Sequence, residues 1–148
     1  MQLEKTFMRI KDEIIKTFSN IPQIDKPGVA VIYNEENISL CNCVNILKED
    51  CESVNFNWFS TKINSKTDEY FVRSILRDYA EMEDVTAVFV LSPLPNNLNN
   101  VKNDLKMMIH YKKYEKINIM ELVNGVTTTG TRITVLGITK EMYTTSKK

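Results

Sequence analysis

Two short apolar runs, at residues 29–33 and 85–91, constrain the fold of this chain more than any other feature. Both are rich in β-branched residues, and neither contains a charged side chain. The first is entered through Pro27-Gly28, and the second is followed closely by Pro93. Undiluted runs of this length are typical of strands that are buried on both faces of a parallel sheet. The pair therefore predicts an α/β fold with helices on both sides of the sheet.

Helical patterns alternate with the strand patterns along the chain. Apolar residues recur at spacings of three and four in four segments, namely residues 3–20, 37–54, 65–81 and 97–111. Shorter strand-like runs are found at residues 56–60, 117–122 and 132–138. This order predicts a single three-layer domain over residues 1–148, with a mainly parallel sheet and right-handed crossovers.

Charge and hydropathy favour some classes of protein over others. The chain has 148 residues, and its 19 basic side chains are balanced by 19 acidic ones. A chain without net charge has no overall field that attracts nucleic acid or an anionic membrane. No apolar run reaches the roughly 20 residues of a membrane span, and the first residues do not resemble a signal peptide. We therefore expect a cytoplasmic protein with neither a nucleic-acid nor a membrane partner.

The three cysteines do not form a metal-binding pattern. Cys41, Cys43 and Cys51 all lie in one predicted helix, and the only histidine, His110, is far along the chain. Structural zinc sites usually combine two ligand pairs, which this spacing does not provide. We expect no metal site, and we expect the thiols to be reduced and to pack as small apolar groups.

Two motifs together resemble a known family. Residues 26–32 read Lys-Pro-Gly-Val-Ala-Val-Ile, and residues 92–95 read Ser-Pro-Leu-Pro. They are similar to the catalytic domain of the bifunctional methylenetetrahydrofolate dehydrogenase/cyclohydrolase family, which typically reads roughly PGLAVILVG and GILVQLPLP at these strands. The resemblance extends from about Phe7 to Asn97 and implies the fold of that domain. Because the matching residues are packing residues, they support the fold better than the activity.

The positions of the family's catalytic residues are occupied differently here. In the family, the helix after the first strand carries a tyrosine and, four residues later, the catalytic lysine. A glutamine precedes the Pro-Leu-Pro motif by two residues. Without gaps from Pro27 to Phe56, the alignment places Cys43 at the tyrosine and Leu47 at the lysine, and Leu91 stands where the glutamine would be. The resemblance thus implies an apolar substrate cleft, lined by Cys43, Leu47, Leu91, Pro93, Leu94 and Pro95.

Two polar or reactive residues could replace the lost groups. Lys48 is adjacent to Leu47, but one residue rotates a side chain by about 100° around a helix, away from the cleft. Lys48 is therefore a weak substitute. Cys43 would need a neighbouring base to become a nucleophilic thiolate, and no histidine is near it in sequence. The resemblance also implies an aspartate after residues 97–111, but residues 116–120 match that part of the family weakly.

Family members carry a further nucleotide-binding domain, for which this sequence offers no counterpart. No G-x-G-x-x-G pattern is present, and only nine residues follow Thr139. We therefore expect no bound cofactor, NADP included, whereas a folate-like small molecule remains possible. The leading hypothesis is a degenerate, non-catalytic homologue with a binding or assembly role. One alternative is a divergent folate enzyme that borrows a cofactor domain from a partner, and another is an α/β scaffold similar only in fold.

The last strand-like run suggests how the chain could associate. An unpaired edge strand is usually covered or paired. Residues 132–138 are thus predicted either to extend the sheet or to pair across a two-fold homodimer, with the dimer favoured. A protein partner is the other possibility.

Overall fold

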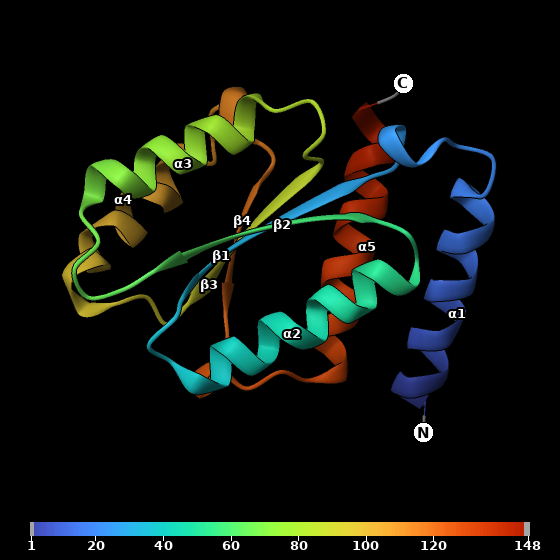
Figure 1. The fold of residues 1–148 in the computed structure, drawn as a ribbon, viewed down its shortest axis with the longest axis horizontal. Helices are drawn as coiled ribbons and strands as arrows, with labels where there is room; N and C mark the ends of the chain where they lie inside the picture. The colour runs from blue at the N-terminus through green and yellow to red at the C-terminus, as the bar shows by residue number, and fades with distance from the viewer. Residues whose placement is uncertain (1, 147–148) are drawn as a thin grey trace.

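The two apolar runs form the central strands of a four-stranded parallel sheet in the computed structural model, which describes residues 2–146 (Figure 1). These strands are β1 (Gly28–Asn34) and β3 (Ala87–Ser92). The edge strands are β2 (Asn57–Ile63) and β4 (Ile117–Glu121), and the order is β2-β1-β3-β4. All of β3 and the first six residues of β1 are buried. The predicted α/β class is confirmed.

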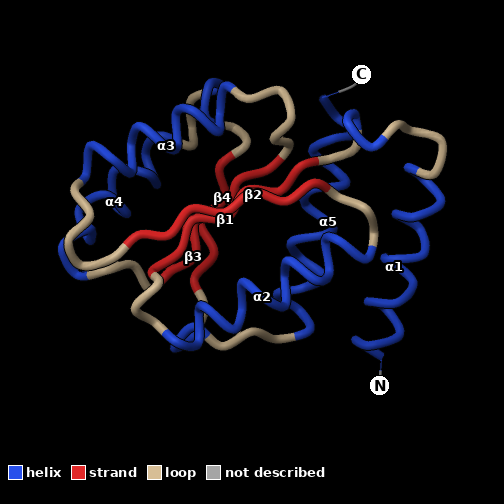
Figure 2. Tube along the Cα trace, in the orientation of Figure 1, coloured by secondary structure: helices blue, strands red, loops and turns tan. Residues whose placement is uncertain are grey.

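Alternate residues of the central strands supply two separate cores. Val31 of β1 lies opposite Phe89 of β3, and both point to the face that is covered by α1 (Gln2–Phe18), α2 (Ile38–Ser53) and α5 (Thr129–Ser146). Ile32 and Val90 point to the other face, under α3 (Glu69–Glu81) and α4 (Asn99–Met108). Figure 2 shows the sheet between these two sets of helices. Helices on both sides explain why the central strands are apolar throughout.

Side-chain caps fix where two of the helices begin. Asn37 precedes α2, and its Oδ1 accepts a hydrogen bond from the Leu40 backbone N–H at 3.0 Å. Asp68 caps α3 in the same way, through the Phe71 N–H at 2.8 Å. Each cap satisfies a backbone donor that has no partner within the helix. The helix predicted from residue 65 therefore begins four residues later.

The prediction that residues 132–138 form a strand is wrong. They belong to α5, the 18-residue helix that packs along α1. The β-branched residues of this segment favour a strand by propensity, but the buried residues of α5, which are Val135, Leu136 and Thr139, follow a helical period. The hydroxyl of Thr139 is satisfied by donating to the Val135 carbonyl at 2.7 Å. Residues 132–138 therefore neither extend the sheet nor offer a strand for a dimer.

A partly buried ion pair joins the three helices of this face. The Arg132 guanidinium of α5 donates to both carboxylate oxygens of Asp50 in α2, at 2.7 and 2.8 Å. The same guanidinium lies 4.5 Å from the ring centroid of Phe7 in α1. Asp50 is buried, and its hydrogen bond raises the pKa of Arg132. Such a bidentate pair holds α5 in one position on α2.

None of the helices in residues 2–146 is both long and apolar enough to cross a membrane.

Candidate functional site

The carboxyl edge of the sheet is the first place to look for a site. In open α/β sheets, ligands gather beyond the carboxyl ends of the strands. Here the segments that leave this edge are residues 35–37 after β1, 64–68 after β2, 93–98 after β3 and 122–128 after β4. The Ser92–Pro93 peptide bond at the end of β3 is cis. The Pro-Leu-Pro motif thus begins directly at this edge.

The three positions that the resemblance singles out are brought together, but they are enclosed. Cys43 and Leu47 lie one turn apart on the inner face of α2, and Leu91 lies on β3. All three are 0% exposed and belong to the same apolar cluster. Lys48 is on the exposed side of α2. Side chains without accessible surface cannot touch a ligand unless the surrounding structure moves.

The Pro-Leu-Pro residues do not share the environment of those three positions. Leu94 is buried in the other cluster, beneath α3 and α4, where it packs with Leu98 and Val101. Pro95 is buried and Pro93 is exposed. Three residues of the expected cleft therefore lie in the core on one face of the sheet, and Leu94 lies in the core on the other face.

Residues 122–128 lie over the first turn of α2. A Cβ atom on Gly125 would come within 3.1 Å of Asn37 Oδ1 and of Ser39 Cβ, and the φ of Gly125 is +75°. Burial raises the pKa of the Cys43 thiol, and a hydrogen bond with Thr127 of this segment opposes that shift. No apolar pattern in the sequence marks this segment as part of a site. The available signal was Asn124-Gly125, a dipeptide typical of tight turns.

Two carboxylates at this edge already have hydrogen-bond or ion-pair partners. Glu36 accepts hydrogen bonds from the backbone N–H and the hydroxyl of Ser65, at 2.6 and 3.2 Å. Glu121 pairs with Lys102 at 2.7 Å, and this contact lowers the pKa of the Glu121 carboxyl. Both carboxylates are exposed. Glu36 connects two loops and Glu121 connects β4 to α4, both at the surface, so the two carboxylates do not form a sheltered acid–base pair.

Thiols and metal ligands do not supply an alternative chemistry here. Cys41, Cys43 and Cys51 are unpaired, and only Cys41 is partly exposed, with its Sγ donating to the Glu35 carbonyl at 3.3 Å. Burial strongly raises the pKa of Cys51. Among residues 2–146, no three His, Cys, Asp or Glu side chains are close enough to hold a metal ion.

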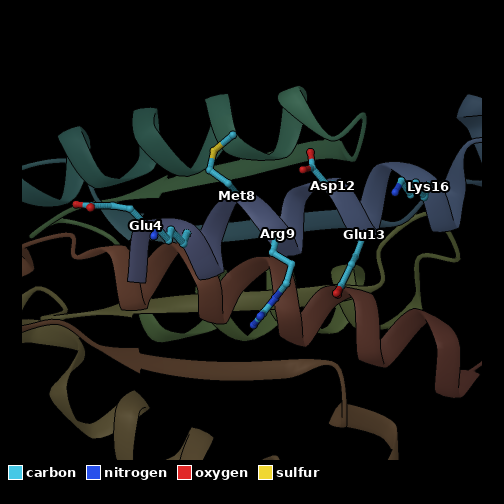
Figure 3. A pocket seen from close by; sticks show the side chains of 7 residues that line it. Glu4, Met8, Arg9, Asp12, Glu13 and Lys16 are labelled. Atoms are coloured by element: carbon cyan, nitrogen blue, oxygen red, sulfur yellow. The ribbon is translucent and has the colours of Figure 1, made fainter. Parts of the chain in front are cut away.

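Two hollows lie away from the carboxyl edge. One is an open depression along the outer side of α1, where charged side chains fan out from a single helix (Figure 3). Its Glu13 points toward α5 and lies 3.7 Å from Lys140. The other is a groove of about 830 Å³ at the opposite, amino edge of the sheet. Neither contains any of the positions that the resemblance singles out.

Comparisons with known proteins identify solved structures that have a similar fold. No protein-family model matches the chain, and the search of curated proteins found no match. Solved structures of folate enzymes do resemble it. The bifunctional FolD methylenetetrahydrofolate dehydrogenase/cyclohydrolase of Campylobacter jejuni is 15% identical with a TM-score of 0.57, over 64% of this chain and 34% of that enzyme.

Two further solved structures of folate enzymes resemble the chain to a similar degree. The Trypanosoma brucei methylenetetrahydrofolate dehydrogenase-cyclohydrolase, solved with NADP and an inhibitor, is 16% identical with a TM-score of 0.61. A Bombyx mori methylenetetrahydrofolate dehydrogenase is 18% identical with a TM-score of 0.58. Each match covers 66% of this chain and 34% of the other chain. The chain thus spans about a third of the length of these enzymes, and at such identities it shares the fold of part of the folate dehydrogenase/cyclohydrolases.

Proposed function

We propose that this chain is a degenerate homologue of the catalytic domain of the tetrahydrofolate dehydrogenase/cyclohydrolases, and that it has a binding or assembly role without the family's chemistry. The observation that carries the proposal is the enclosure of Cys43, Leu47 and Leu91 in one apolar cluster. These are the positions at which the resemblance places the tyrosine, the catalytic lysine and the glutamine.

The proposal follows from what acid–base catalysis requires. A catalytic group must carry a transferable proton and must lie within about 2.6–3.2 Å of the atom that it serves. Leucine has no such proton, and Leu47 and Leu91 have no exposed surface. Lys48 has the proton, but it is on the exposed side of α2. A positioned acid or base typically contributes 10²–10⁴-fold to the rate, and we expect that contribution to be absent here.

Activity assays on the purified chain test this proposal. The cyclohydrolase reaction is a hydrolysis and consumes no nicotinamide, so it tests the chain alone. The dehydrogenase reaction is assayed with NADP. We expect neither reaction to exceed the background rate, with an intact family enzyme as the positive control. Turnover comparable to that enzyme, surviving the Lys48→Ala substitution, would contradict the proposal and would favour a divergent folate enzyme that uses rearranged residues.

A titration with tetrahydrofolate, followed by calorimetry, addresses the ligand separately. Saturable binding without turnover supports a folate-binding relative. Absence of binding supports a protein that is similar to the family in fold only. NADP serves as a parallel titration, in which we expect no binding because the sequence has no G-x-G-x-x-G turn.

The assembly role needs a measurement of its own. Size exclusion with light scattering distinguishes a monomer from a homodimer, which remains part of the proposal. Because residues 132–138 are helical, a dimer would not form by pairing strands at these residues.

A further inference from the structure

The groove at the amino edge of the sheet has the dimensions of a binding site. Its volume is about 830 Å³, within the range of about 300–1,000 Å³ for ligand pockets. Its walls come from the segments just before β1, β3 and β4 and from the last two turns of α5. Figure 1 shows the end of α5 beside the segment that enters β1. There the Tyr143 hydroxyl donates to the Asp25 carbonyl at 2.9 Å.

Apolar side chains lie between the polar groups of this groove. Val85 is buried, and Ile138 and Met142 of α5 are partly buried. Ile24 lies at the rim and is 75% exposed. Methionine adapts its shape readily and is common in binding surfaces that accept varied partners. The groove can therefore bury aliphatic groups as well as meet charged ones.

The charges that line the groove are unbalanced, although the chain as a whole is neutral. Within residues 2–146, five acidic residues line it, namely Asp25, Glu83, Asp84, Glu115 and Glu141. The two lysines that line it are held by backbone carbonyls. Lys26 donates to the Phe18 carbonyl at 3.1 Å, and Lys116 donates to the Met82 carbonyl at 2.9 Å. Counted over residues 2–146, the lining of the groove thus carries more negative than positive charge, and each of its two ammonium groups already makes one hydrogen bond to a backbone carbonyl.

We propose that this groove binds a basic segment of a partner protein, in which lysine or arginine side chains lie beside aliphatic ones. The aliphatic stems of lysine and arginine pack on apolar surface while their heads reach carboxylates, and complementary charge favours such a partner over neutral or acidic ones. In the part of the chain that the structure describes, the carboxylates are too dispersed to hold one metal ion. Dispersed carboxylates fit the separated charges of an extended segment. The inference deepens the proposed binding role and rests on it.

Fluorescence anisotropy with the full chain tests the inference. The probe is a short labelled peptide of alternating lysine and alanine, and the matched peptide has glutamate in place of lysine. We expect saturable binding of the lysine peptide at low salt, weakening as salt screens the charges, and no binding of the glutamate peptide. Glu141→Lys should weaken binding about fivefold. Glu52→Lys makes the same change of net charge on the exposed side of α2 and should change affinity less than twofold.

A second pair of variants tests the apolar part of the groove. Ile24→Ser should weaken binding about threefold, because the isoleucine no longer covers an aliphatic stem. Val123→Ser is the control, since Val123 is 81% exposed at the opposite edge. Both side chains are too exposed for either change to endanger folding.

Two results would overturn the inference: no binding of the lysine peptide at low salt, or equal weakening by Glu141→Lys and Glu52→Lys. Absence of both turnover and peptide binding removes this inference and leaves the non-catalytic proposal intact. Turnover together with groove-dependent peptide binding contradicts the non-catalytic proposal and leaves this inference intact.

Discussion

The two edges of one sheet differ in how they are filled and in the side chains that line them. At the carboxyl edge, where α/β proteins usually bind ligands, apolar side chains fill the space around Leu47 and Leu91. At the amino edge, a groove of about 830 Å³ is lined by carboxylates. Both edges belong to the same four strands. Similarity of fold therefore locates an edge of the sheet, but the side chains at that edge decide whether it can bind or react.

The carboxyl edge is closed because its covering segment is held at both ends. The Leu122 N–H donates to the Ser92 carbonyl at 3.0 Å, which ties the start of residues 122–128 to the end of β3. Arg132, in the first turns of α5, is tied to the buried Asp50 of α2. No equivalent segment crosses the groove in residues 2–146.

The largest effect is expected from placing a lysine at the enclosed position. Leu47→Lys buries an ammonium group in an apolar cluster that offers it no partner, and we expect it to lower the free energy of unfolding by about 3–5 kcal/mol. Urea denaturation measures the change. Lys48→Ala is the matched control on the exposed side of the helix, with an expected change within about 0.5 kcal/mol. If Leu47→Lys is as stable as the wild type, the carboxyl edge opens to water and the contrast between the edges fails.

A substitution at the amino edge tests how closely the backbone packs there. A Cβ atom on Gly28 would lie 1.9 Å from the Asp84 backbone oxygen, so the segment before β3 must move. We expect Gly28→Ala to cost about 3 kcal/mol in thermal or urea unfolding. Because Asp84 lines the groove, the variant should also bind the lysine peptide more weakly.

Gly137→Ala provides the control for that substitution. Nothing lies within 4 Å of a Cβ atom at Gly137, which is inside α5. Alanine there should stabilise the protein by about 0.5–1 kcal/mol through helix propensity. Equal effects of the two substitutions would contradict the close approach at Gly28.

A smaller effect is expected where the covering segment meets α2. Gly125 has a φ of +75°, and a Cβ atom there would crowd Asn37 and Ser39. We expect Gly125→Ala to cost about 1–2 kcal/mol and to raise the hydrogen-exchange rate of residues 122–128. Exchange at the amino edge should not change. Faster exchange at both edges would show that residues 122–128 stabilise the whole protein and not only the carboxyl edge.

The smallest effect concerns the pH dependence of the enclosed thiol. Burial raises the pKa of Cys43, so above the ordinary thiol value of 9.0 the unfolded chain releases a proton that the folded chain keeps. Its contribution to stability is complete below pH 9 and falls as the pH rises further, by at most about 1.4 kcal/mol per pH unit. Cys43→Val should flatten the decline of unfolding free energy between pH 9 and pH 10 in urea titrations. An unchanged slope would mean that the thiol reaches solvent.

Much of the fold could be predicted because two signals agreed at the central strands. The run at residues 29–33 was both apolar and bounded by Pro27-Gly28, and β1 includes it with one further residue at each end. The strand prediction for residues 132–138 failed because a short window of β-branched residues is ambiguous between strand and helix. A window extended to Tyr143 gives only a weak helical signal, because Arg132 and Thr139, which share the helical spacing of Leu136 and Tyr143, are polar.

The candidate site could be predicted only in part. Helical spacing correctly placed Cys43 and Leu47 on one face of α2 and Lys48 on another. Their enclosure depends on residues 122–128, more than seventy positions later, and local patterns carry no information about such a contact. The groove was missed for the same reason, since its lining comes from segments as distant as Asp25 and Glu141.

The packing of α5 on α1 has a consequence for folding during synthesis, because α5 leaves the ribosome long after α1. The core under α3 and α4 is complete once β4 has emerged, because it uses no residue beyond Ile119. The other core needs Val135 and Leu136 of α5 to cover residues of α1 that were made first. During synthesis one face of the sheet can thus mature while the other still exposes Phe7, Ile14 and Phe18. That interval is when a nascent chain of this design most needs a chaperone.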